Sequence, residues 1–143
     1  MTPGAAPGRT LPPYLNSWGE WMEQHELEHY RAGLAARRGQ QRDKMEARRL
    51  CVLSQAREAA AGLLALGGQR VLLFGSVLRP HRFHERSDVD MLLYGLPAEK
   101  FSAALGLVEM WPGLEEVEID LKLAEDQRAE FVSAVEEQGE FVP

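Results

Sequence analysis

The feature that most constrains the fold of this chain is a pair of short apolar runs joined by a polar segment. Val71–Phe74 and Met91–Tyr94 are long enough for buried strands but short for helices. The segment between them contains glycine, proline, histidine and many charged residues, which favour turns and loops. We therefore predict two neighbouring strands of one sheet, connected by residues 75–90.

Two aspartates stand at the entrance to the second of these strands. Side chains alternate along an extended backbone, so Asp88 and Asp90 should point to the same side of the sheet and Val89 into the core. Two like charges held side by side are unfavourable unless a positive charge lies between them. A hard cation such as Mg²⁺ binds carboxylate oxygens and leaves positions for substrate phosphates. The pair is therefore a candidate metal site, although the string Ser-Asp-x-Asp alone is equally typical of a solvated strand start.

The Gly75-Ser76 turn at the end of the first strand is a candidate phosphate-binding element. Gly75 allows the backbone to approach a ligand closely. Ser76 offers a hydroxyl at the expected start of a short helix, where free N–H groups favour phosphate. No histidine is spaced to activate Ser76 as a nucleophile. A phosphate-binding turn next to metal-binding carboxylates fits nucleotidyl transfer.

A third carboxylate is expected on a later strand. Glu116–Leu123 alternates apolar and polar residues, the pattern of a half-buried strand. Asp120 and Glu118 fall on the same face of this strand, so alternation alone permits either of them.

These residues resemble the minimal nucleotidyltransferases of the DNA polymerase beta superfamily. The signature of that family is a strand, Gly-Ser, a spacer, Asp-x-Asp on the next strand and a further acidic residue on a later strand. Gly75-Ser76 and Asp88-Val89-Asp90 match it, and the family pattern favours Asp120 over Glu118. The resemblance implies an α/β (α+β) fold with a polymerase beta-like core, in which helices flank a small mixed β-sheet after a long N-terminal helical extension.

The resemblance also implies the chemistry and the roles of the site residues. Asp88 and Asp90 would hold two Mg²⁺ (or Mn²⁺) ions, and Asp120 would hold the catalytic one, with ATP or another nucleoside triphosphate as substrate. The candidate nucleotide-binding residues are Gly75, Ser76, Arg79 and Ser87. Arg79 could instead pair with a surface carboxylate, and Ser87 could serve only as a turn residue.

Small members of this family include the antitoxins of HEPN/minimal-nucleotidyltransferase pairs, which transfer AMP to a tyrosine of the toxin. The resemblance therefore implies a protein adenylyltransferase with a HEPN-type toxin as partner. Two other classes stay open. One is a stand-alone nucleotidyltransferase that acts on a small molecule or a nucleic-acid end, and the other is a non-catalytic antitoxin or binding module.

The composition bears on the number of domains, the class of partner and the cellular compartment. The chain has 143 residues, of which 45% are hydrophobic, as expected for one globular domain with an extension. Its net charge of −6 does not favour nucleic acid as a general partner. No apolar run is long enough to span a membrane, and the N-terminus lacks the apolar core of a signal peptide. The single Cys51 fits a reducing compartment. We therefore expect a cytoplasmic protein.

We divide the chain into a flexible Pro- and Gly-rich tail (1–13), an N-terminal helical arm (14–44) and a nucleotidyltransferase domain (45–143). Helix-forming residues from about Trp18 to Leu66 predict either one long helix or two helices broken near Gly39. An apolar stripe on the arm is either core or a protein–protein surface such as a homodimer contact; it comprises Trp18, Trp21, Met22, Leu27, Tyr30 and Leu34. Beyond the second strand we predict helices over Ala98–Met110 and Asp126–Gln138 and a short edge strand at Glu140–Val142.

Overall fold

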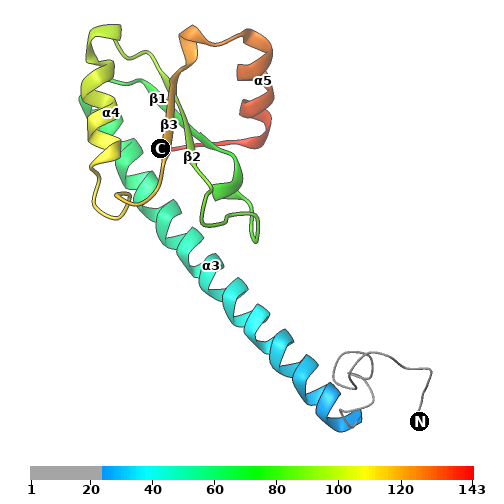
Figure 1. The fold of residues 1–143 in the computed structure, drawn as a ribbon. Helices are drawn as coiled ribbons and strands as arrows, with labels where there is room; N and C mark the ends of the chain where they lie inside the picture. The colour runs from blue at the N-terminus through cyan, green and yellow to red at the C-terminus, as the bar shows by residue number, and fades with distance from the viewer. Residues whose placement is uncertain (1–23) are drawn as a thin grey trace, which may run out of the picture. The chain divides into compact units, whose positions relative to one another are not determined.

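The computed structural model describes residues 24–143, which form a mixed α and β structure (Figure 1). The predicted tail, and Trp18, Trp21 and Met22 of the arm, lie outside the described residues. Within them the α-helices are α3 (Gln24–Leu66), α4 (Phe101–Glu109) and α5 (Ala129–Gln138), and the strands are β1 (Arg70–Phe74), β2 (Val89–Tyr94), β3 (Ile119–Leu123) and β4 (Glu140–Phe141). Short 3-10 helices, η1 (Ser76–Leu78), η2 (Ala98–Lys100) and η3 (Ala124–Asp126), follow β1, precede α4 and follow β3.

The first described element, α3, is one uninterrupted helix, which excludes a break near Gly39. Gly33 and Gly39 both lie inside it, and a Cβ atom added at either position would meet nothing within 4 Å. The chain divides between Gln41 and Arg42 into two units. In the first unit, Tyr30 of the apolar stripe is 47% exposed. In the second, α3 supplies a buried stripe that packs on the sheet.

The four strands form one mixed sheet in the order β3-β2-β1-β4. The two predicted strands, β1 and β2, are antiparallel neighbours, and β3 runs parallel to β2. The register places Phe74, Asp90 and Asp120 opposite one another across three adjacent strands. The carboxylates of β2 and β3 are thus brought to the same end of the sheet as the turn that follows β1.

Three predicted boundaries are wrong. The strand predicted from Glu116 begins only at Ile119, because a turn closed by the Val117 N–H and the Leu114 carbonyl precedes it. The helix predicted from Asp126 begins at Ala129, because Asp126 belongs to η3. The helix predicted from Ala98 opens as η2 and becomes α-helical at Phe101.

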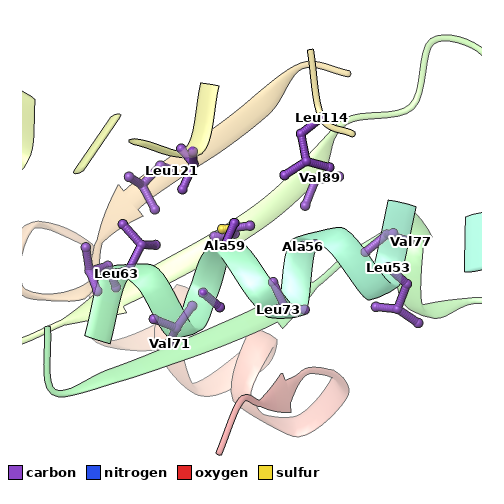
Figure 2. Close-up of a cluster of buried hydrophobic side chains, with 14 of the residues drawn as sticks. Leu53, Ala56, Ala59, Leu63, Val71, Leu73, Val77, Val89, Leu114 and Leu121 are labelled. Atoms are coloured by element: carbon purple, nitrogen blue, oxygen red, sulfur yellow. The ribbon is translucent and has the colours of Figure 1, made fainter. Parts of the chain in front are cut away.

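The sheet has two unlike faces. One is covered by α3 and α4 and forms the main core (Figure 2). The other is covered by α5 and contains few fully buried residues, chiefly Leu72 and Leu92. Val89 is fully buried in the main core, so Asp90 lies on the α5 side, as the alternation predicts. No helix within residues 24–143 is both long and apolar enough to cross a membrane.

Candidate active site

Gly75 lies directly against the carboxylate of Asp90. Its φ of 86° and ψ of −160° are accessible to glycine but not to ordinary side chains. A Cβ atom at this position would come within 2.2 Å of Asp90 Oδ2. Glycine is therefore required at position 75 for two reasons: the backbone conformation excludes other residues, and a side chain would collide with Asp90. The group that lies against Gly75 is the second aspartate of the Asp-x-Asp pair. The close approach of a ligand to Gly75 stays a prediction.

Ser76 opens a short helix, as predicted. The Leu78 N–H donates to the Gly75 carbonyl at 3.2 Å, and the Arg79 N–H donates to the Ser76 carbonyl at 3.0 Å. The side chain of Ser76 is half-buried beside Gly75 and takes no part in capping this helix. A hydroxyl is thus presented at the turn that lies over the Asp90 carboxylate.

Three aspartates gather at this end of the sheet. Asp90 and Asp120 occupy opposite positions on the parallel strands β2 and β3, and Asp88 directly precedes β2. The pKa of Asp90 is raised to about 6 by burial and, secondly, by the negative charges of Asp120 and Asp88. The three carboxylates therefore repel one another across a partly dehydrated site, and a cation bound there would relieve that repulsion.

Lys122 is a residue of this cluster that the sequence interpretation did not select. Its Nζ donates to Asp120 Oδ2 and forms an ion pair with it. Its positive charge also acts on Asp90, where it opposes the rise in pKa. The signal was present in the sequence, because residues two apart on a strand share a face and Lys122 follows Asp120 at that spacing.

The structure also separates the two candidates for the third carboxylate. Asp120 stands inside β3 opposite Asp90, whereas Glu118 precedes the strand and is exposed. The Glu118 carbonyl accepts a hydrogen bond from the Val89 N–H at 2.9 Å, so its backbone guides the chain into register. Asp120 therefore lies opposite Asp90 on the neighbouring strand, whereas Glu118 lines an exposed hollow together with Asp88.

The two remaining nucleotide-binding candidates have protein partners. Arg79 Nη2 donates to Gln138 Oε1 at 2.7 Å, so its partner is a neutral amide at the end of α5 and not the surface carboxylate considered as the alternative. Ser87 Oγ accepts the His84 N–H at 2.8 Å, which gives it the role of a turn residue. Arg79 keeps an uncompensated charge near the Gly75-Ser76 turn. A nucleotide contact by either residue stays a prediction.

A hollow of about 360 Å³ lies beside Asp88. Carboxylates outnumber cations in its lining, which consists of Glu85, Arg86, Ser87, Asp88, Glu116 and Glu118. Such a surface repels a polyphosphate and suits a neutral or cationic group.

The donor set fits a hard divalent cation, but it is not gathered into a ready-made site. No group of three or more histidine, cysteine, aspartate or glutamate side chains is arranged to hold a metal ion within residues 24–143. The Asp120 carboxylate is turned to Lys122 instead. The chemistry still fits Mg²⁺, because the neighbouring donors are carboxylate oxygens, which this cation prefers. Lys122 pairs with Oδ2 of Asp120 and would compete with a cation for this carboxylate.

The chain was also compared with known proteins. No protein-family model and no curated protein matches it. The aspartates, the glycine turn and the resemblance of their motifs are the features that point to a function.

Proposed function

We propose that this protein is a Mg²⁺-dependent nucleotidyltransferase with a polymerase beta-like core, which transfers AMP from ATP to a hydroxyl group of a protein partner. The observation that carries the proposal is the close approach of the Gly75 backbone to Asp90, with Asp120 opposite on the adjoining parallel strand. This arrangement supports the proposal, because the turn that would bind phosphate lies directly against one of the carboxylates that would bind the metal.

In the proposed reaction Asp88 and Asp90 would hold both metal ions, and Asp120 would hold the one at the reacting centre. Bound Mg²⁺ would supply Lewis-acid activation of the α-phosphate and neutralise the charge of the leaving pyrophosphate. Gly75 allows the triphosphate to pass close to Asp90, and the Ser76 hydroxyl would donate to a phosphate oxygen. Asp120, once released from Lys122, would orient the incoming hydroxyl and accept its proton. The new bond joins the acceptor oxygen to the α-phosphorus, and the bond to the β-phosphate oxygen breaks.

The acceptor belongs to the part of the proposal that rests on family resemblance. The second unit, residues 42–143, contains the whole candidate site. A partner protein would then present the hydroxyl, as the toxin does in HEPN/minimal-nucleotidyltransferase pairs. The acidic hollow beside Asp88 is compatible with a neutral tyrosine hydroxyl flanked by basic residues.

Transfer of label tests the proposal directly. Purified protein is incubated with Mg²⁺ and each α-labelled nucleoside triphosphate, with and without a candidate HEPN-type partner or cell lysate. We expect label from ATP to become covalently attached to a protein. The Asp88→Ala/Asp90→Ala variant should abolish transfer, and Asp126→Ala, which removes an exposed carboxylate in η3, should not. Absence of both transfer and Mg²⁺-dependent nucleotide binding in the unsubstituted protein would refute the proposal.

A further inference from the structure

Arg49 is the only buried charged or polar residue in the described part of the chain, at 5% exposure. It lies on α3, outside the cluster of aspartates. A buried guanidinium is unfavourable unless its hydrogen bonds are satisfied, because removal from water is costly. Its partners therefore show what this charge is used for.

The partners of Arg49 lead to the segment that follows the Gly75-Ser76 turn. Arg49 Nη1 donates to the Val77 carbonyl at 2.8 Å. Arg49 Nε and Nη2 donate to the two carboxylate oxygens of Glu46 at 3.0 and 2.7 Å. Glu46 Oε1 in turn accepts the backbone N–H of His81 at 3.0 Å. One ion pair on α3 thus holds both ends of the segment from Val77 to His81.

These contacts fix the turn at the level of single peptide groups. The Val77 carbonyl and the Leu78 N–H belong to one planar peptide unit. Arg49 holds the carbonyl side of that unit, and the Gly75 carbonyl holds the N–H side at 3.2 Å. The side chain of Val77 is fully buried at the Leu53 end of the helix (Figure 2). Rotation of this unit would displace Gly75 from its position against Asp90.

The far end of the segment is held in a conformation that needs support. His81 is the only residue other than glycine with a positive φ, 63°, in residues 24–143. A non-glycine residue in this left-handed region is uncommon. The His81 N–H donates its hydrogen bond to Glu46. The ion pair therefore stabilises the loop at the residue with the left-handed backbone.

We infer that the Arg49–Glu46 pair is a positioning device for nucleotide binding, which keeps the Gly75-Ser76 turn at the place over Asp90 where the triphosphate passes. The inference rests on the proposed function. Neither residue touches the substrate; both act through the backbone of residues 77–81. The competing view is that the pair only fastens α3 to the sheet.

The chain contains a matched control for that view. Arg57, also on α3, forms a bidentate ion pair with Glu140 of β4, with both N–O distances at 2.8 Å. It fastens the same helix to the same sheet without contacting the turn. A change at Arg57 reproduces the loss of an ion pair on α3. Because the Arg57 side chain is 47% exposed and that of Arg49 is 6% exposed, unchanged Mn²⁺ binding by the Arg49 variant is the second control for its fold.

The experiment compares Arg49→Met with Arg57→Met by calorimetric titration with ATP·Mg²⁺ and with Mn²⁺ alone. We expect R49M to weaken ATP binding by about tenfold or more, the effect of losing a hydrogen bond to a charged group, and to leave Mn²⁺ binding unchanged. R57M should leave both unchanged. Arg49→Lys, which keeps the charge and one contact, should restore part of the ATP affinity. If R49M does not fold, R49K and Arg57→Lys carry the same comparison.

The outcomes separate the two proposals. Unchanged ATP affinity in the folded Arg49 variants, with normal binding by the unsubstituted protein, overturns the inference alone. Equal losses in the Arg49 and Arg57 variants also overturn it, in favour of a purely structural role. Absence of ATP binding in the unsubstituted protein overturns the proposed function, and the inference with it.

Discussion

The two faces of the sheet are built from the same strands but are chemically different. The face under α3 and α4 is an apolar core in which Val71, Leu73 and Met91 are fully buried. The face under α5 contains Leu72 and Leu92 in its middle and the aspartates at one end, and α5 itself has no fully buried residue. A strand with period two allows both at once, because alternate side chains serve opposite faces.

This difference suggests that one face of the sheet provides stability and the other face carries the candidate site. Close-packed apolar side chains provide stability on one side. On the other side, burial and like charge hold the carboxylates in an unfavourable arrangement, a feature typical of functional sites. Substitutions on the two faces should therefore separate effects on folding from effects on ligand binding.

The largest expected effect is on the core face. Leu63→Ala removes a fully buried side chain of α3 from the main core, and such changes lower the free energy of unfolding by about 2–5 kcal/mol. Phe131→Ala on α5 removes a half-buried ring that packs edge-on against Phe74, with the two ring centroids 6.0 Å apart. We expect a loss of less than half that of L63A, measured by urea unfolding. Equal losses would contradict this difference between the two faces.

The next largest effect is expected at the turn between β1 and η1. Gly75→Ala forces a side chain into a positive φ and against Asp90, so we expect stability to fall by about 1–3 kcal/mol and ATP·Mg²⁺ binding to be lost. Gly106→Ala is the control, because a Cβ atom there meets nothing within 4 Å and α4 should gain about 1 kcal/mol. Retention of nucleotide binding in G75A would show that the turn does not carry the triphosphate.

Much of this arrangement follows from local sequence patterns. The period-two alternation of β2 is enough to predict that Val89 is buried and that Asp90 lies on the other face. Asp88 precedes the strand, so its sharing a face with Asp90 stays a prediction. The apolar runs of Val71–Phe74 and Met91–Tyr94 are enough to predict two strands. Alternation also misleads, because Glu116–Glu118 continues the pattern of β3 through a turn.

What the sequence does not reveal depends on tertiary contacts. The pairing of Asp90 with Asp120 requires the strand order and the parallel direction of β3, which no local pattern encodes. The contact of Arg49 with the Val77 carbonyl joins residues 28 positions apart. α3 continues through Gly33 and Gly39. The low helix propensity of these two glycines is therefore outweighed by the helix-forming residues around them.

A smaller effect is expected in the pH dependence of stability. The pKa of Asp90 is raised from 3.8 to about 6, so the folded protein binds this proton more tightly than the unfolded chain does. Asp90 therefore destabilises the fold as the pH rises from about 4 to about 6. Asp90→Asn cannot titrate, and its stability relative to the unsubstituted protein should increase across that range. Urea unfolding in the presence of a chelator measures this difference, and a constant difference would mean that Asp90 is not under this strain.

The smallest effect is expected at Lys122, which brings a positive charge to the carboxylate face. Because Lys122 is paired with Asp120 and competes with a bound cation, Lys122→Met should strengthen Mn²⁺ binding roughly threefold to tenfold, the size of one partly screened charge at short range. Lys100→Met removes an exposed lysine whose Nζ donates to the Leu66 carbonyl, and it should leave Mn²⁺ binding unchanged. Binding is measured by the loss of the free Mn²⁺ signal in electron paramagnetic resonance. Weaker Mn²⁺ binding in K122M would mean that Lys122 helps to form the metal site. The α5 face would then depend on a cation as well as on its three aspartates, and would differ less from a stabilising face than we propose.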